Sequence, residues 1–437
     1  MSAPAETPFG VRVESFGCRL NLVESEAMRR AALAAGRENL IIVNSCAVTA
    51  EATRQARQTI RRLARENPGA EIVVTGCAAE VEPGRFRAMP EVARVLGNAA
   101  KSDPVVWSRR DAAAPGVMER PAAPLPLAQG VEDHTRAFLA VQTGCDHRCT
   151  FCVIPYARGP SRSAPPDEIL DAARKLSARG FREIVLTGVD LTSYDCGGLR
   201  LGGLARAILR AAPGLDRLRL SSIDCVEADA ELFAAFAEEE RLAPHLHLSL
   251  QSGDDLILKR MKRRHSRAEA VEFCAALRRL RPEIAFGADL IAGFPTETEA
   301  QFCNTLALVE DCGLTYLHVF PFSPREGTPA ARMPQTDPAA ARARAARLRE
   351  KGAEALARRH AQKIGTRFAA LAERGGHARA ADFTLLRTPG APPGRMIEFL
   401  ALRDEGKALS GETLSGETLS GETVSGETFG AAGGREG

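Results

Sequence analysis

Short apolar runs alternate with helix-length amphipathic segments through the first hundred residues. The apolar runs at 11–16, 40–44 and 71–76 are separated by helical patterns at about 21–35 and 50–66. Strands that alternate with helices favour a parallel α/β sheet. We therefore expect an N-terminal α/β domain over residues 9–101.

A second alternating series fills the middle of the chain. Helix-length segments separate apolar runs at 138–143, 182–187, 217–222, 245–250, 285–291 and 316–320. Six such repeats predict a partial (β/α)6 barrel over residues 137–335, so that the whole chain is of the α/β class. In such folds the reactive groups lie at the carboxyl ends of the strands.

The remaining segments have other patterns. A Pro- and Ala-rich stretch at 102–136 predicts a linker, and residues 336–363 predict a long basic helix. Weak alternation at 364–408 predicts a small, reduced β-barrel. The tail at 409–437 repeats Ser-Gly-Glu-Thr at a five-residue period, and we expect it to be disordered.

Composition narrows the class of protein. The chain has 437 residues, 45% of them hydrophobic, which is enough for more than one core. Its 58 Lys and Arg nearly balance 55 Asp and Glu, so any RNA contact must come from local patches. No secretory signal or membrane-length apolar run is visible, and we expect a cytoplasmic protein. Eleven cysteines in that compartment favour metal or redox chemistry over disulfides.

Three cysteines follow the first strand of the predicted barrel with C-x3-C-x2-C spacing, namely Cys145, Cys149 and Cys152. Three thiolates can bind three irons of a 4Fe-4S cluster, and the absence of a nearby fourth cysteine leaves one iron open. An open iron can chelate S-adenosylmethionine (SAM) and cleave it to a 5′-deoxyadenosyl radical. A zinc knuckle is the alternative, but it needs a fourth ligand at regular spacing, and His147 lies inside the triplet.

A second set of cysteines is spread through the first domain. Cys18, Cys46 and Cys77 each follow one of three successive predicted strands. In a parallel sheet they share the carboxyl edge and can converge on a second open 4Fe-4S cluster. The alternative for each is a small buried hydrophobe, which we expect for Cys196, Cys225, Cys274, Cys303 and Cys312.

The residues around the cysteines resemble the radical-SAM methylthiotransferase family from about residue 11 to 332. The motifs that carry the resemblance are Gly17-Cys18-Arg-Leu-Asn21, Asn44-Ser-Cys46-Ala-Val-Thr49, Thr75-Gly-Cys77, and the 145–152 triplet that continues into Ile154-Pro155-Tyr-Ala-Arg158-Gly159. Within the family, the stretch Leu186-Thr-Gly-Val-Asp190 looks most like the MtaB branch.

The resemblance implies that Cys145, Cys149 and Cys152 bind the SAM cluster and that Cys18, Cys46 and Cys77 bind an auxiliary cluster. It implies methylthiolation of C2 of N6-threonylcarbamoyladenosine at position 37 in the tRNA anticodon loop. Two SAM molecules would serve, one as methyl donor and one as radical source. Further expectations are an electron donor such as flavodoxin or ferredoxin, a monomeric state and no membrane contact.

Several alternatives stay open at this point. Within the family, the substrate would instead be N6-isopentenyladenosine-37 of tRNA or an aspartate of a ribosomal protein. From another class, the chain would be an iron–sulfur or zinc RNA-binding regulator that never turns SAM over.

Two further groups of residues are candidates by position. At or after the ends of barrel strands, the SAM-binding candidates are Gly188, Asp190, Ser222, Gln251 and Gly293, with Asp190 departing from the Gly-Gly-Glu motif of many radical-SAM proteins. Basic side chains that would contact RNA phosphates are Arg54, Arg57 and Arg61 on one helix face, together with Lys262 and Arg263. Family members usually end in an RNA-binding β-barrel called TRAM, and residues 364–408 are short for one.

Overall fold

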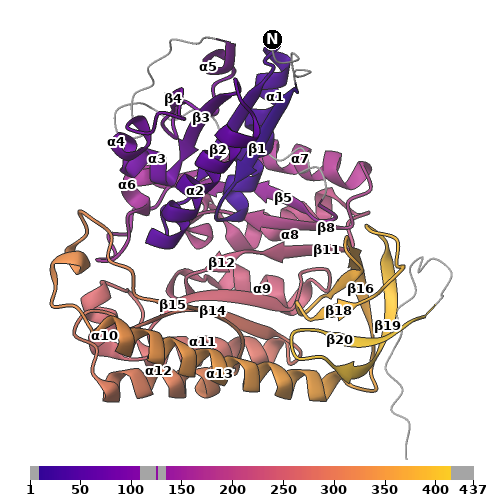
Figure 1. The fold of residues 1–437 in the computed structure, drawn as a ribbon. Helices are drawn as coiled ribbons and strands as arrows, with labels where there is room; N and C mark the ends of the chain where they lie inside the picture. Colours follow the sequence, from indigo (N-terminus) through magenta and orange to yellow (C-terminus); the bar gives the residue numbers. More distant parts are fainter. Residues whose placement is uncertain (1–8, 109–124, 126–133, 415–437) are drawn as a thin grey trace, which may run out of the picture.

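The computed structural model describes residues 9–108, 125 and 134–414. Figure 1 shows an N-terminal α/β domain, a central set of parallel strands covered by helices, and a small β-barrel formed by the C-terminal residues. The predicted fold class is therefore confirmed. No helix in the described part of the chain has the length and apolar character needed to cross a membrane.

The N-terminal domain is a parallel four-stranded sheet in the order β1-β2-β3-β4. Strand β2 is buried along its whole length, as expected for a strand in a sheet with both faces covered. The elements are β1 (Val11–Ser15), α1 (Arg19–Ala34), β2 (Leu40–Ser45), α2 (Ala50–Glu66), β3 (Glu71–Gly76), α3 (Cys77–Val81), α4 (Pro83–Arg87), β4 (Arg94–Val95) and α5 (Pro104–Ser108).

Helix α5 corrects the predicted start of the linker at residue 102. Trp107 on this helix is fully buried, and its indole N–H donates to the Lys101 carbonyl oxygen at 3.0 Å. Pro104 is the first residue of α5, where the missing N–H costs nothing. The first domain therefore continues to Ser108, and residues 109–133 of the predicted linker, apart from Leu125, lie outside the described residues.

The predicted partial barrel is present, and its strands follow one another in chain order. One parallel sheet has the order β11-β8-β5, and a second has the order β12-β13-β14-β15. The strands are β5 (Ala137–Ala140), β8 (Glu183–Thr187), β11 (Arg217–Leu220), β12 (Ser222–Ile223), β13 (His245–Gln251), β14 (Ala285–Ala292) and β15 (Leu314–Pro321).

Helices cover the outside of these strands and enclose the most extensive apolar core of the chain. The helices of this part of the chain are α6 (Ile154–Arg158), α7 (Pro166–Ala178), α8 (Leu201–Ala211), α9 (Ala230–Glu238), α10 (Asp255–Met261), α11 (Arg267–Leu280), α12 (Glu299–Asp311) and α13 (Pro338–Lys363). Helix α6 is the exception among them, because it packs on α3 of the first domain. Shorter elements are β6 (Gln142–Thr143), β7 (Arg162–Ser163), η1 (Leu191–Ser193), β9 (Asp195–Cys196), β10 (Leu199–Arg200), η2 (Cys225–Glu227) and η3 (Pro329–Arg332).

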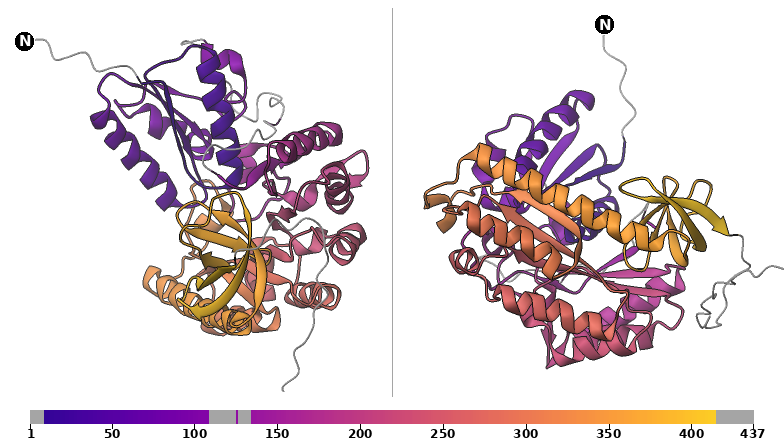
Figure 2. Two further views of the ribbon diagram at one scale, coloured as in Figure 1. Left: turned by 90° about the vertical axis from the view of Figure 1, so that its right-hand side faces the viewer. Right: turned by 90° about the horizontal axis from the view of Figure 1, so that it is seen from below.

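Helix α13 is the predicted basic helix, and it packs on the barrel as the partner of β15. A Cβ atom added to Gly352 would meet the Leu317 side chain at 3.0 Å, which shows how closely the helix and strand approach. Figure 2 shows α13 lying across the barrel and leading into the C-terminal barrel. The helix therefore completes the last β/α unit, although its sequence is dominated by Arg and Ala.

The C-terminal residues form a closed barrel in the order β16-β17-β18-β20-β19. Its strands are β16 (Arg367–Glu373), β17 (His377–Ala380), β18 (Leu385–Arg387), β19 (Met396–Asp404) and β20 (Leu409–Leu414). The C-terminal barrel contacts the central strands near their amino ends. Arg219 on β11 donates to the Ala381 carbonyl oxygen at 2.9 Å, and His245 on β13 stacks on Phe383.

Strand β20 corrects the predicted end of this segment at residue 408. The first Ser-Gly-Glu-Thr copy, from Ser410 to Thr413, pairs with β19 and closes the barrel. A Cβ at Gly411 would lie 1.9 Å from the Leu400 carbonyl oxygen, so only glycine fits there. The polar repeat lacks the alternation of apolar and polar residues that is typical of a strand, and it is held in the barrel by backbone pairing with β19. The later copies lie outside the described residues.

Truncation tests this boundary. A chain that ends after Leu414 is expected to keep the barrel, whereas a chain that ends after Ala408 loses the hydrogen bonds of β20 to both of its neighbours. Limited proteolysis of the two proteins measures the difference. Equal protease resistance of residues 367–404 would contradict the assignment of β20 as a closing strand.

Candidate active site

The three cysteines of the first domain lie at one edge of its sheet. Cys18 precedes α1, Cys46 follows β2, and Cys77 begins α3 directly after β3. A Cβ on Gly17 would lie 2.7 Å from the Cys46 sulfur, so the loop that carries Cys18 passes over Cys46. Burial, with a smaller contribution from the nearby Cys77 and Cys18 sulfurs, raises the pKa of the Cys46 thiol to about 12. The predicted convergence is present.

Arg158 connects this edge to the second domain. It is the last residue of α6, six positions after Cys152, and its Nε donates to the Cys77 sulfur at 3.2 Å. Glu24 on α1 accepts two hydrogen bonds from the same guanidinium, at 2.6 and 3.0 Å, and Lys101 binds Glu24 at 2.6 Å. Two buried cations thus surround one carboxylate, which leaves a positive charge beside Cys77. Arg158 belongs to a sequence motif that by itself does not indicate this contact with Cys77.

The C-x3-C-x2-C triplet occupies the loop between β6 and α6. Its turns are fixed by the backbone, because the Cys152 N–H donates to the Cys149 carbonyl oxygen and the Cys145 N–H to that of Gly159, both at 3.1 Å. Gly144 has φ +76°, and a Cβ there would lie 1.8 Å from the Pro160 carbonyl oxygen. All three thiols are partly buried. The local sequence therefore holds them close together in a short loop.

The two triplets lie near each other across the domain boundary, because Arg158, six residues after Cys152, contacts the Cys77 sulfur. Burial raises the pKa of the Cys152 thiol to about 12, and the charge of Cys77 in the other domain adds to this rise. A cavity of about 180 Å³ opens beside them. It is lined by Val48 and Thr49 after Cys46, by Phe151 inside the triplet, and by barrel residues Gln251, Asp289, Ile291, Phe320, Pro321, Phe322 and Ser323.

The spacing within each triplet suits a cluster of several irons better than one ion. In the part of the chain that the structure describes, four groups of His, Cys, Asp or Glu have ligand atoms within 4.8 Å of one another, and neither triplet is among them. One zinc ion would hold its sulfurs closer than this, because each Zn–S bond is about 2.3 Å long. One of the four groups joins Cys145 to His147 and Asp190, so a zinc ion would use one cysteine of the triplet and not all three.

Asp190 lies beside the second triplet, as its predicted role requires. Its carboxylate is 3.7 Å from the Cys145 sulfur and 2.8 Å from His147 Nε2. Hydrogen bonds to Asp190 and Glu227 raise the pKa of His147 to about 10, so this imidazole is cationic at neutral pH. His147 thereby fixes the Asp190 carboxylate.

The other SAM-binding candidates divide into two pairs. Gln251 lines the cavity, and Ser222 is partly exposed at the start of β12. By contrast, the two glycines pack against protein: a Cβ on Gly188 would be 2.8 Å from Gln142 Oε1, and one on Gly293 would be 2.3 Å from the Ala341 Cβ. Gly293 therefore permits the close approach of α13 rather than offering a surface to a ligand.

Arg263 does not lie at the surface, contrary to the prediction that it contacts RNA. Helix α10 ends at Met261, and Lys262 adopts φ +57°, which turns the chain inward. The Arg263 guanidinium therefore donates to Asp224 at 2.7 Å and lies 3.6 Å from the Cys149 sulfur. It places a positive charge at the triplet, and Lys262 stays exposed.

The predicted RNA-binding arginines lie on α2. Arg54 and Arg61 are exposed, and Arg57 is partly exposed. Arg54 is bound to Glu51 one turn earlier, which neutralises part of its charge. Helix α2 follows Cys46, so this basic face begins next to the cavity.

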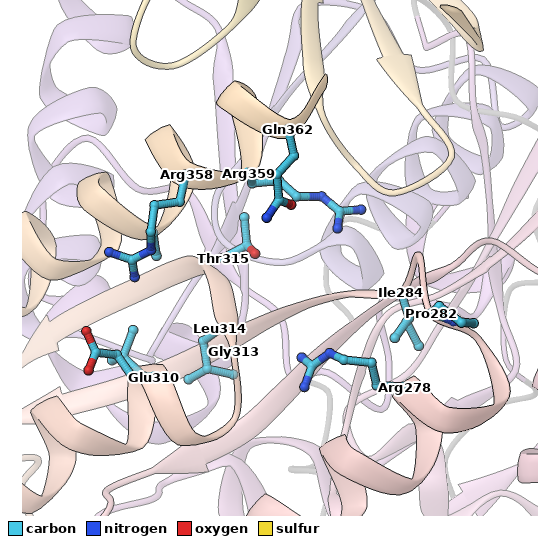
Figure 3. A pocket seen from close by; sticks show the side chains of 12 residues that line it. Arg278, Pro282, Ile284, Glu310, Gly313, Leu314, Thr315, Arg358, Arg359 and Gln362 are labelled. Atoms are coloured by element: carbon cyan, nitrogen blue, oxygen red, sulfur yellow. The ribbon is translucent and has the colours of Figure 1, made fainter. Parts of the chain in front are cut away.

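A larger cavity, of about 660 Å³, lies at the opposite end of the strands. Figure 3 shows Arg278, Glu310 and Arg358 around it, with Thr315 near the start of β15. No cysteine contributes to its lining, and Glu310 is bound to Lys351. The cavity therefore belongs to the packing of α11, α12 and α13 at the amino ends of the strands.

Comparison with known proteins agrees with this arrangement. Residues 139–309 match the Radical SAM superfamily, and residues 10–97 match the Uncharacterized protein family UPF0004. The chain is similar in structure to the radical S-adenosylmethionine methyltransferase TsrM from Kitasatospora setae, with a TM-score of 0.51 and 17% sequence identity. The match covers 71% of this chain and 68% of the TsrM chain. That likeness concerns the fold.

Relatives extend the match to most of the chain. The threonylcarbamoyladenosine tRNA methylthiotransferase MtaB of Rickettsia prowazekii is 46% identical over 85% of this chain and 89% of that protein. MtaB of Thermotoga maritima is 38% identical over 74% and 77%. A tRNA-2-methylthio-N6-dimethylallyladenosine synthase of Methylococcus capsulatus is 34% identical over 84% and 85%. The chain therefore belongs to the radical-SAM methylthiotransferase family, whose enzymes use SAM and 4Fe-4S clusters to transfer a sulfur-containing group.

Proposed function

We propose that this enzyme methylthiolates C2 of N6-threonylcarbamoyladenosine at position 37 of tRNA. The observation that carries the proposal is the pair of cysteine triplets that lie near each other across the domain boundary and beside one cavity. The choice of base is supported by the relatives, since the Rickettsia prowazekii MtaB is 46% identical to this chain while the dimethylallyladenosine synthases reach 34 to 36%.

Each triplet is assigned one cluster. Cys145, Cys149 and Cys152 hold the cluster that binds SAM, and the auxiliary cluster is held by Cys18, Cys46 and Cys77. When bound, these groups and two SAM molecules supply the electron, the hydrogen-abstracting radical, the sulfur and the methyl group. Arg158 and Arg263 each place a buried positive charge beside a triplet, which stabilises the anionic thiolates that iron binding requires.

The remaining residues bind SAM and RNA. Asp190, Ser222 and Gln251 lie at the strand ends where SAM would extend from its cluster. The adenine base enters the cavity, whose walls include Phe151, because a base must leave its loop stack to reach both clusters. Outside the cavity, the contacts to the phosphates of the anticodon loop come from Arg54, Arg57, Arg61 and Lys262.

A small electron-transfer protein such as a flavodoxin or ferredoxin supplies the electrons for SAM cleavage. The enzyme acts as a monomer on tRNA in the cytoplasm. Size-exclusion chromatography with light scattering tests the oligomeric state.

Nucleoside analysis of tRNA tests the substrate. In a strain that lacks this gene, we expect 2-methylthio-N6-threonylcarbamoyladenosine to vanish and its unthiolated precursor to accumulate, measured by liquid chromatography and mass spectrometry. Restoring the gene returns the nucleoside. Loss of a methylthiolated isopentenyladenosine instead would support the alternative base and contradict the one proposed.

A further inference from the structure

Arg19 stands directly after Cys18 as the first residue of α1. Its side chain is partly buried. Among the residues that the structure describes, none forms a hydrogen bond or an ion pair with its guanidinium group, although the neighbouring buried arginines are all paired. None of its nitrogens is among the fully buried polar atoms, so a ligand can reach the guanidinium, and an unpaired cation in a partly buried position favours an anionic ligand.

The charges around Arg19 strengthen this requirement. Burial, with Arg136, Arg219 and Arg379 nearby, lowers the pKa of Arg19 to about 10, which still leaves it cationic at neutral pH. Glu183 is the acidic group that opposes these effects most strongly. The region therefore holds an excess of positive charge.

The nearby carboxylates are already committed to other arginines. Glu183 is bound by Arg219 at 2.8 Å and by Arg217 at 3.0 Å. Glu373 is bound by Arg136 at 2.8 Å and by Arg379 at 3.3 Å. Neither carboxylate is left to neutralise Arg19.

A second polar group in the same region lacks a partner. His245 is 4% exposed, and neither of its ring nitrogens has a hydrogen-bond partner in the described residues. Burial lowers its pKa well below the usual value, and Arg219, His247 and Arg19 lower it further, so the ring is neutral. A neutral imidazole can both donate and accept a hydrogen bond. The region thus combines an unpaired cation with an unpaired polar group.

We propose that Arg19 binds the α-carboxylate of the N6-threonylcarbamoyl group and so selects this base. The inference rests on the proposed function. C2 and N6 lie on the same edge of adenine, so a base with C2 directed to the Cys18, Cys46 and Cys77 triplet can extend its N6 substituent away from the cavity, toward the amino ends of β8 and β13. Glu183 and His245 begin these strands and lie near Arg19. Arg19 is the residue next to Cys18. The threonyl group is the part of this substituent that carries a negative charge.

This assignment also explains discrimination between bases. An isopentenyl group is neutral and apolar, so it would leave the guanidinium of Arg19 desolvated and unpaired. A site built to bind a charged group rejects an analogue that lacks it, because its own polar atoms stay unsatisfied. An RNA phosphate is the other anion that Arg19 would attract, and the test separates the two.

The test combines one substitution in the protein with one chemical change in the substrate, so that two proteins are each compared on two tRNAs. The holoenzyme and its Arg19→Met variant are assayed on tRNA with N6-threonylcarbamoyladenosine-37 and on the same tRNA with the threonyl carboxylate capped as a methyl ester. We expect the ester to lower kcat/KM of the wild type about 10- to 100-fold, mainly through KM. The variant loses a similar factor on the acid and is indifferent to the ester.

Further measurements exclude a structural effect. Iron content and reductive SAM cleavage of Arg19→Met are expected to match the wild type, and Arg19→Lys is expected to recover part of the loss because it keeps the charge. Equal rates of the wild type on the acid and the ester would overturn the inference and leave the proposed function intact. That comparison needs no variant, so it holds even if Arg19→Met fails to fold. A wild type that modifies neither tRNA contradicts the proposed function itself, and the inference falls with it.

A loss in Arg19→Met that is equally large on both tRNAs would assign Arg19 to an RNA phosphate instead. This outcome also overturns the inference, because a phosphate contact does not respond to the ester.

Discussion

Replacing Cys149 by alanine is expected to abolish reductive cleavage of SAM, whereas Cys46→Ala is expected to abolish methylthiolation and leave SAM cleavage in place. The two thiols lie in different domains and belong to different triplets. A cluster with an open iron needs all three of its thiolates, because two leave it poorly anchored. Removing one thiol therefore disables one half of the reaction. Both expected results depend on the proposed assignment of one cluster to each triplet.

The measurement is 5′-deoxyadenosine formed in the presence of dithionite, together with methylthiolated nucleoside in tRNA. Cys303→Ala is the matched control, since Cys303 is exposed on α12, contrary to the prediction of a buried side chain, and is distant in sequence from both triplets. Cleavage of SAM at the wild-type rate by Cys149→Ala would refute the assignment of this triplet. Methylthiolation by Cys46→Ala would refute the other.

Arg158→Met is expected to give the second large effect, on stability and on the auxiliary cluster together. The substitution removes a guanidinium that is bonded to both Glu24 and Cys77 in the interior. Breaking a buried ion pair costs about 3–5 kcal/mol, and Lys101 keeps Glu24 partly neutralised, which favours the lower end. Loss of the charge beside Cys77 also weakens its thiolate form.

Urea denaturation and iron analysis of the purified protein measure the two effects. Arg12→Met serves as the control because Arg12 pairs with Glu14 in the same domain, but at the surface. We expect the control to retain its iron and nearly all of its stability, as exposed pairs contribute little. If Arg158→Met keeps the full iron content of the wild type, then Arg158 holds the domains together without supporting the auxiliary site.

The sequence by itself determined the parts of the protein that depend on local pattern. Alternation of strands and helices predicted the parallel sheets, because a strand covered on both faces must be apolar along its length. The parallel sheet then placed Cys18, Cys46 and Cys77 at one edge, and the structure brings them together there. The spacing of Cys145, Cys149 and Cys152 similarly sufficed to predict a shared loop, since three residues so close in sequence cannot lie far apart.

Tertiary structure decided the features that depend on partners far apart in sequence. Arg263 belonged to a basic run, and only the left-handed turn at Lys262 directs it inward to Cys149. The contact of Arg158 with Cys77 spans 81 residues, and nothing near either residue announces it. Strand β20 likewise needs β19 to give its polar repeat an ordered backbone. In each case the deciding energy is electrostatic pairing or backbone hydrogen bonding across the fold, which local hydrophobic pattern does not encode.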